Sequence, residues 1–383
     1  MAGNITFDQP EPTLGGKLLA LPWVFILMVV TLGLIGGAAL YSAANGSFEP
    51  WAKPHLVRFG MSVAVMIVMA LVDIRFWFRL SYPAYAVTLA LLAGVEVAGK
   101  VGAFGAQRWI NLGFVQIQPS ELMKIALVMA LARYFHALIP EDTQRLRTLV
   151  PPVLMILAPT AFVLLQPNLG TAIMLTLAGA AMLFVGGARL WLFGAVAAVG
   201  AAALPIAWRH MHGYQKRRVM TFLDPSSDPL GAGYHITQSR IALGSGGLFG
   251  KGFLNGTQSH LNFLPEKQTD FIFPLLAEEW GLWGGVALLA LFALVSFYGV
   301  GVGLRSRSQY GRMLAIGLSV NLFLYVFINV AMVMGLIPVV GVPLPLISYG
   351  GTSMLAVMMG FGLLISVLIH RDAKITRRHP LGD

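Results

Sequence analysis

Long apolar stretches separated by polar segments recur along almost the whole chain. Each stretch is roughly 17–25 residues long, enough for an α-helix to cross a hydrocarbon core of about 30 Å. Because backbone polar groups in lipid must be satisfied within the protein, such runs are predicted to be helices. Ten spans are predicted: Leu19–Ser42, His55–Val72, Leu80–Ala98, Leu122–Ala137, Leu149–Leu165, Gly170–Val185, Leu190–Trp208, Phe271–Val302, Arg312–Met334 and Thr352–His370.

Composition agrees with this pattern. Of the 383 residues, 57% are hydrophobic and 11% are charged, and the mean hydropathy is +0.75. A soluble domain carries about 25% charged residues. The chain begins with a polar stretch and its first apolar run has full span length, which predicts no cleavable signal peptide. We therefore expect an all-α integral membrane protein that forms one polytopic domain over residues 1–383.

Basic residues of the short segments fall mainly on one side of the predicted membrane. Lysine and arginine accumulate in the cytoplasmic loops of membrane proteins. With the N-terminus inside, the inner segments carry Lys17, Arg75, Arg79, Arg133, Arg145, Arg147, Arg189, Arg305, Arg307, Arg312, Arg371, Lys374, Arg377 and Arg378, and the outer ones carry Lys53, Arg58, Lys100, Arg108 and Lys124. Both termini are therefore predicted to be cytoplasmic. A long polar segment between spans seven and eight, about residues 209–270, is predicted to face outward.

This long outer segment is itself basic. It holds Arg209, Lys216, Arg217, Arg218, Arg240, Lys251 and Lys267 against Asp224, Asp228, Glu266 and Asp270. One interpretation is a loop that contacts solvent or lipid headgroups, since long loops are largely exempt from the charge rule. The other is a site for an anionic substrate, because arginine and lysine suit phosphate groups. We expect no nucleic-acid partner.

The stretch Gly244–Gly281 leads from this segment into an apolar helix and carries acidic residues. Regular helix is predicted from about Ile272, which leaves Asp270 at or just before the helix N-terminus. An aspartate there is either a helix N-cap or a functional carboxylate near membrane depth. Glu278 and Glu279 follow inside the same span, and one of them could line a shared cavity.

Two other regions carry polar residues at span ends. In Gln107–Lys124, Glu121 and Lys124 are three residues apart and share a helix face, either as a helix-end ion pair or as substrate contacts. Arg108 could anchor to lipid headgroups or bind a phosphate. In Gly335–Ser353, Ser348 could offer a donor to a substrate from non-helical backbone that lines a cavity, or the segment could be an ordinary re-entrant turn.

Several other chemistries are disfavoured by the sequence. The stretch GSGGLFGKG has Ser245 in place of the first glycine of a phosphate-binding P-loop and Gly252 in place of its Ser or Thr. The chain has no cysteine, which excludes disulfides and thiolate metal sites. The spacing of the histidines matches no metal site.

Several long sequence motifs lie in and next to the polar segments, in a fixed order. They are RWINLG and QPSELMK within 108–124, QPNLGTA at 166–172, YHITQSRIALGSGGLFGKGF at 234–253, GTQSHLNFLPEKQTDFIF at 256–273, AEEWG at 277–281 and IPVVGVPLPLISYGGTS at 337–353. On these motifs the chain resembles the RodA/FtsW (SEDS) family of bacterial cell-wall polymerases over essentially its whole length. QPNLGTA and FLPEKQTDFIF are more similar to the elongation branch, RodA, than to the division branch.

The resemblance implies a ten-helix fold in the bacterial cytoplasmic (inner) membrane and polymerisation of lipid II into glycan strands on the outer face. It also implies an essential acid at Asp270 and, as partner, an elongation-type class B penicillin-binding protein, the transpeptidase. The candidate substrate contacts are Arg108, Glu121, Lys124, Arg240, Lys251, Lys267 and Ser348. The family usually has an acid in QPDLGT where this chain has Asn168, which argues against a second carboxylate or a metal ligand there.

The expected chemistry is an inverting glycosyl transfer, because lipid II carries an α-linked sugar pyrophosphate and the glycan bond is β. Such a transfer needs a base, for which Asp270 is the candidate, and cations for the departing pyrophosphate. The sequence requires no cofactor and leaves a divalent cation open. Two alternatives are a transporter that flips lipid II and a non-catalytic scaffold for the transpeptidase. The charged groups gather at the outer mouth, which favours the enzyme over the transporter.

Overall fold

The computed structural model describes residues 14–98, 100–101, 107–111, 116–139, 142–210, 213–225, 231–261, 263–264 and 266–375. Its helices are α1 Leu14–Leu19, α2 Trp23–Ala43, α3 Ala52–Leu71, α4 Ile74–Ala98, α5 Pro119–Ala137, α6 Leu146–Leu165, α7 Leu169–Val185, α8 Leu190–His210, α9 Gly213–Leu223, α10 Ala232–Ser245, α11 Thr257–His260, α12 Ile272–Arg305, α13 Gln309–Val333 and α14 Gly351–Ile369. The strands are β1 Lys100–Val101, β2 Gln107–Asn111 and β3 Gln116–Ile117, and a 3₁₀ turn covers Asp142–Gln144.

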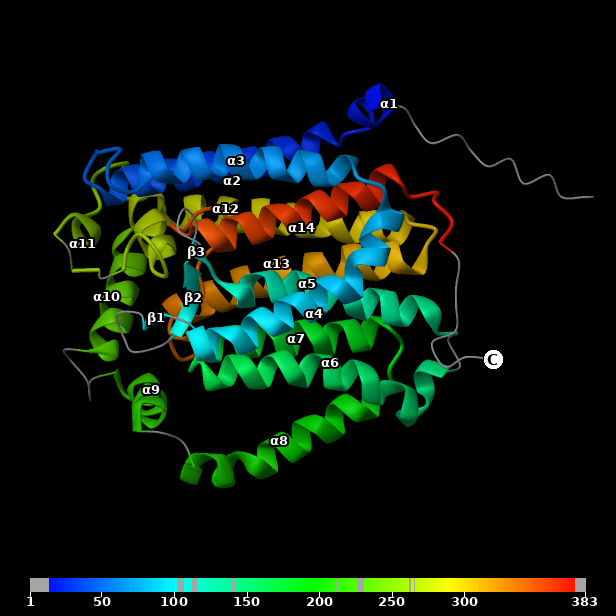
Figure 1. The fold of residues 1–383 in the computed structure, drawn as a ribbon. Helices are drawn as coiled ribbons and strands as arrows, with labels where there is room; N and C mark the ends of the chain where they lie inside the picture. The colour runs from blue at the N-terminus through cyan, green and yellow to red at the C-terminus, as the bar shows by residue number, and fades with distance from the viewer. Residues whose placement is uncertain are drawn as a thin grey trace, which may run out of the picture.

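The long helices run roughly along one direction as an up-and-down bundle (Figure 1). Each of the ten predicted spans coincides with one of the helices α2–α8 and α12–α14. Seven of these are long and apolar enough to cross a membrane, which confirms a multi-pass membrane protein. The other three are α5, which contains buried charged residues, α7, which has 17 residues, and α8, whose shorter apolar part covers Leu190–Ala203. The count of ten spans therefore stays a prediction.

The two ends of the bundle differ. The start of α2 and the end of α14 lie at one end, and the three strands with α9, α10 and α11 lie at the other (Figure 1). Helices α5 and α13 are strongly enclosed: α13 packs against α5, α7, α12 and α14, and most of its own side chains are buried. Outer helices expose large apolar side chains such as Leu27, Leu157 and Val196, as a lipid-facing surface requires.

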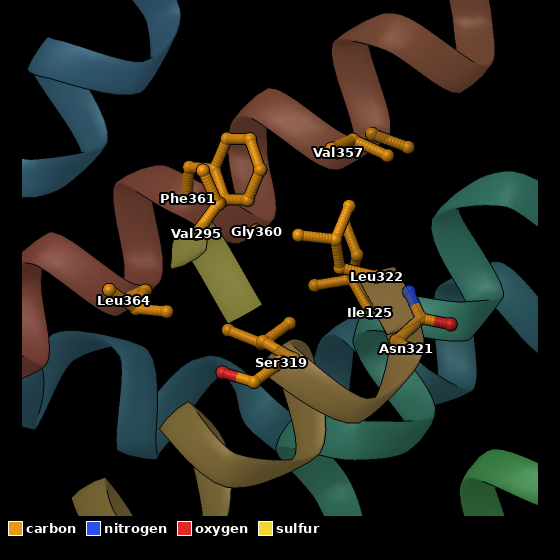
Figure 2. A pocket seen from close by; sticks show the side chains of 11 residues that line it. Ile125, Val295, Ser319, Asn321, Leu322, Val357, Gly360, Phe361 and Leu364 are labelled. Carbon is orange, nitrogen blue, oxygen red and sulfur yellow. The ribbon is translucent and has the colours of Figure 1, made fainter. Parts of the chain in front are cut away.

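A small apolar void lies in the bundle between α5, α12, α13 and α14 (Figure 2). Its volume is about 20 Å³, and Ser319 and Asn321 of α13 are its polar lining residues. The Ser319 hydroxyl donates to the carbonyl of Ala315 at 2.8 Å, whereas the Asn321 side-chain oxygen is buried without a hydrogen-bond partner. Because such a volume holds only about one water molecule, this void is a packing defect and not a binding site.

The segment between α4 and α5 forms a small antiparallel sheet, which the all-α prediction did not include. Its strand order is β1-β2-β3, with Lys100 opposite Trp109 and Ile110 opposite Ile117. The prediction is correct for the helical bundle and incomplete for this segment. Strands of two to five residues carry too little alternation to be recognised in a sequence.

The long outer segment also contains more regular structure than expected, because α9, α10 and α11 lie within it. Its glycine-rich part docks on a break in α12. At Gly281 the backbone (φ 70°, ψ −168°) is non-helical. The carbonyls of Glu278 and Glu279 therefore point out of the helix and accept hydrogen bonds of 3.0 Å from the N–H groups of Lys251 and Gly252. These bonds fix the outer segment to α12.

Two glycines permit this docking. A Cβ at Gly250 would lie 2.1 Å from the carbonyl oxygen of Glu279, and one at Gly246 would lie 2.1 Å from that of Ala277. Gly250 also has φ +79°, where other residues are strained. The stretch that superficially suggests a P-loop therefore serves backbone packing.

Candidate functional site

A polar cavity of about 210 Å³ lies at the end of the bundle that carries the small sheet. Its lining residues are Arg108, Trp109, Gln118, Glu121, Lys124, Asn168, Thr171, Met174, Thr269, Asp270, Tyr325, Gly341, Val342, Pro343, Tyr349, Gly350 and Ser353. They come from β2, the starts of α5, α7 and α14, helix α13 and the segments before α12 and α14. Four predicted site residues, Arg108, Glu121, Lys124 and Asp270, thus meet at one place.

Asp270 lies at the junction between the outer segment and α12. This helix begins at Ile272, as predicted, and its N-cap residue is Phe271. The interpretation of Asp270 as the N-cap is therefore wrong. Its side chain is half-buried and lines the cavity, with Oδ2 close enough to Gly341 that an added Cβ there would be 3.3 Å away. The backbone places a carboxylate at the cavity wall.

Glu121 and Lys124 form an ion pair in the wall. α5 begins at Pro119, and Lys124 Nζ lies 2.7 Å from Glu121 Oε1, with both side chains almost fully buried. Tyr325 of α13 donates its hydroxyl to the other oxygen of Glu121, and its ring lies 4.0 Å from Lys124 Nζ. Burying two charges is tolerable only when they are paired and hydrogen-bonded. The predicted pair is thus confirmed as an ion pair that also lines the cavity.

Arg108 fixes the sheet to the segment before α7. Its Nε donates to the carbonyl of Gln166 at 3.1 Å, and its Nη2 donates to that of Pro167 at 2.6 Å. Asn168 is the N-cap of α7, and its Oδ1 accepts a hydrogen bond of 3.3 Å from the N–H of Thr171. An asparagine caps a helix as well as an aspartate does. The cavity therefore keeps its shape without a second carboxylate at this position.

Ser348 has a structural position beside the cavity. Its hydroxyl accepts a hydrogen bond from the N–H of Leu344 at 2.7 Å and donates to the carbonyl of Thr269 at 2.6 Å. It is not among the described lining residues, whereas its neighbour Tyr349 is. Ser348 thus fastens the segment before α14 to the segment that carries Asp270.

Lys251 lies in a second polar cluster, away from the cavity lining. Its Nζ is 2.7 Å from Glu278 Oε1 and 2.7 Å from Thr257 Oγ1. The neighbouring Glu279 accepts a hydrogen bond from Ser42 and lies 3.6 Å from His260 Nε2. Neither glutamate is among the described lining residues of the cavity. The two acids tie α12 to the outer segment and to α2.

Two further cations of the outer segment also lie outside the described cavity lining. Arg240 donates from Nε to the carbonyl of Met334 at 3.3 Å, near the end of α13. Lys267 is 6% exposed, and burial lowers the pKa of its ammonium. Arg240, Lys251 and Lys267, which were predicted as substrate contacts, are thus not among the described lining residues of the cavity, whereas Arg108 and Lys124 are.

Sequence reasoning misses two polar residues of α13. Tyr325 lines the cavity, and Asn329 donates its amide to the carbonyls of Asp270 at 3.0 Å and Val342 at 2.7 Å. The available signal was a polar side chain inside an apolar span. In the described part of the chain, no three His, Asp or Glu side chains gather where they could hold a metal ion.

Fold and site together define a multi-pass membrane protein with a cavity at one bundle end, walled by two acidic and two basic side chains. Comparison with known sequences then identifies the family. The sequence model of the FtsW/RodA/SpoVE family of cell cycle proteins matches residues 18–373, and the chain belongs to this family.

Two individual relatives support this family assignment. The chain is 44% identical over 352 residues to the peptidoglycan glycosyltransferase MrdB of Escherichia coli K12, covering 90% of this chain and 93% of the relative. It is 35% identical to the stage V sporulation protein E of Bacillus subtilis 168, covering 90% and 95%.

Solved structures show the same fold. A chain from a study of the structural coordination of polymerization and crosslinking by a peptidoglycan synthase complex superposes with a TM-score of 0.78 at 31% identity, covering 92% of this chain and 98% of that one. The rod shape determining protein RodA of Thermus thermophilus superposes with a TM-score of 0.70 at 29% identity, covering 93% and 99%.

Proposed function

We propose that this protein is a peptidoglycan glycosyltransferase that polymerises lipid II into glycan strands during cell elongation. The observation that carries the proposal is the convergence of Asp270, Arg108 and the Glu121–Lys124 pair on one cavity. The name of the E. coli relative supports the activity. Ligand pockets commonly measure about 300–1,000 Å³. The cavity, at about 210 Å³, is smaller than this, so in this proposal it holds only the reacting groups, and the rest of the substrate with its prenyl tail lies outside.

The proposed reaction is a direct displacement with inversion. The acceptor hydroxyl oxygen attacks the anomeric carbon of the donor sugar, and its proton passes to the Asp270 carboxylate. The bond between that carbon and the pyrophosphate oxygen breaks, and the electron pair leaves with the pyrophosphate. The Arg108 guanidinium, held at the cavity wall by its hydrogen bonds to the carbonyls of Gln166 and Pro167, stabilises the departing charge through its positive charge, assisted by the Lys124 ammonium. A divalent cation could join them at the pyrophosphate, and its requirement is tested by adding a chelator to the assay.

The proposed setting is the bacterial cytoplasmic (inner) membrane, with both termini in the cytoplasm and the cavity on the outer face. The up-and-down arrangement supports this, because the cavity lies at the bundle end opposite the start of α2 and the end of α14. The proposed partner is a class B penicillin-binding protein, the elongation transpeptidase. The structural relative studied in a peptidoglycan synthase complex supports such a partner.

The test uses the purified full chain with its transpeptidase, labelled lipid II and separation of the glycan products on a gel. A positioned base contributes about 10²–10⁴-fold to a rate. We therefore expect Asp270→Asn to lower the polymerisation rate at least about 100-fold. Asp372→Asn is the matched control, because Asp372 is 59% exposed at the opposite end of the bundle and should leave the rate unchanged.

The outcomes separate the alternatives. If Asp270→Asn polymerises at nearly the normal rate while correctly folded, Asp270 is not the base. If the unmodified protein makes no glycan but moves lipid II across vesicle membranes, it is a transporter. If it does neither and only binds the transpeptidase, it is a scaffold.

A further inference from the structure

Three consecutive backbone carbonyls before α12 are each held by a different donor from elsewhere in the chain. Gln268 accepts a hydrogen bond of 2.7 Å from the N–H of Tyr349. Thr269 accepts one of 2.6 Å from the hydroxyl of Ser348, and Asp270 accepts one of 3.0 Å from the amide of Asn329. The backbone that carries Asp270 is therefore fixed at every residue from 268 to 270.

The bond from Asn329 fills a place that the helix cannot fill. The carbonyl of Asp270 would meet the N–H of residue 274 in a regular helical turn. Pro274 stands there and has no N–H. The amide of Asn329 supplies the missing donor from α13 and gives its second hydrogen to the carbonyl of Val342. One side chain thus joins two cavity walls, because Asp270 and Val342 both line the cavity.

The remaining atom of this amide indicates that Asn329 does not serve stability alone. Asn329 is fully buried, and its Oδ1 has no hydrogen-bond partner. A buried polar atom without a partner destabilises a fold. Turning the amide over would bring this oxygen against two carbonyl oxygens, so the donors must face Asp270 and Val342.

We propose that Asn329 is a positioning residue for the glycosyl transfer: it sets the place and direction of the Asp270 carboxylate relative to the cavity wall at Val342. This inference rests on the proposed role of Asp270 as the base. Asn329 is not among the described lining residues of the cavity, so we expect it not to contact the substrate. Its loss should therefore change the rate of the chemical step and leave substrate binding nearly unaltered.

The experiment compares two buried asparagines on the same helix. Asn329→Leu removes both donors and the unpartnered oxygen at similar size. Asn321→Leu makes the same change at the apolar void (Figure 2), where the side-chain oxygen of Asn321 is also without a partner. Steady-state polymerisation of labelled lipid II by the full chain with its transpeptidase gives kcat and KM for each, and thermal melting in detergent monitors folding.

Displacing a catalytic group by about 1 Å can lower the reaction rate by about 100-fold. We expect Asn329→Leu to lower kcat by about 10- to 100-fold with KM changed less than about threefold, and Asn321→Leu to leave both unchanged. If Asn329→Leu does not fold, Asn329→Ala is measured instead, because it adds no bulk. It must then show the same loss of kcat with a nearly unchanged KM. Equal kinetics for the two leucine variants, or a loss confined to KM, would overturn the proposal.

A double variant separates this inference from the assignment of the base. Because Asn329 acts through Asp270, adding Asn329→Leu to Asp270→Asn should lower the residual rate no further. If Asp270→Asn is inactive but Asn329→Leu has the normal kcat, only the positioning role fails. If Asp270→Asn retains normal kcat, the proposed base fails, whatever Asn329→Leu does.

Discussion

At the scale of single residues, the Glu121–Lys124 pair shows which contacts a sequence reveals. Residues three apart on a helix are neighbours, so their pairing could be predicted from spacing alone. Tyr325, which completes the group, lies 204 residues from Glu121 in the chain. No local pattern connects the two, and only the packing of α13 on α5 brings them together.

Breaking this pair should be costly. Lys124→Met leaves the Glu121 carboxylate buried without its cation, which typically costs about 3–5 kcal/mol. We expect a large fall in the melting temperature in detergent, and a much smaller one when Glu121→Gln is added. The control is Lys53→Met, whose 3.2 Å pair with Glu49 has side chains 68% and 64% exposed. Loss of such an exposed pair costs about 0–1 kcal/mol. Equal melting shifts for both lysine variants would contradict the buried pairing.

At the scale of elements, the break in α12 organises the outer segment. Gly281 interrupts the helix, and the N–H groups of Leu282 and Trp283 beyond it donate to the carbonyls of Gly247 and Leu248. The glycine-rich stretch and the kinked helix thus complete each other's backbone hydrogen bonds. The fold uses these glycines to bring two backbones together.

Gly250→Ala tests this docking. Alanine at φ +79° is strained by about 1–3 kcal/mol, and its Cβ would also meet the Glu279 carbonyl oxygen at 2.1 Å. We expect the melting temperature to fall by several degrees. Gly244→Ala is the matched control, because a Cβ there meets nothing within 4 Å and alanine favours helix α10 by about 1 kcal/mol. If both variants melt alike, the outer segment does not dock on α12 as described.

Helix α12 also shows which contacts could not be predicted from the sequence. Hydrophobic runs predicted the helices, and α12 begins at Ile272, where regular helix was predicted to begin. The contacts of Lys251, Glu278 and Glu279 arise where the outer segment docks at the break in α12 at Gly281, and a backbone break is not encoded in apolar periodicity. The resemblance to the family placed Lys251 with Arg108 as a candidate substrate contact, whereas the fold pairs Lys251 with Glu278 at 2.7 Å.

At the scale of the whole molecule, span count and orientation are linked. Lys53 precedes nearly all of α3, and Asp372 follows α14. If all ten predicted helices span the membrane, nine of them lie between these two residues, because only α2 lies before Lys53. Nine is an odd number of crossings, so Lys53 and Asp372 must face opposite sides. If only the seven long apolar helices span the membrane, six of them lie between the two residues, and Lys53 and Asp372 must face the same side.

Single cysteines can decide between these arrangements, since the chain has none of its own. Lys53→Cys and Asp372→Cys place thiols at side chains that are 68% and 59% exposed. In intact cells without an outer membrane, a membrane-impermeant maleimide should label Lys53→Cys at once and Asp372→Cys only after permeabilisation. Labelling of both in intact cells would contradict ten spans. The reverse pattern would put the cavity on the cytoplasmic face, where it could not polymerise lipid II outside the cell.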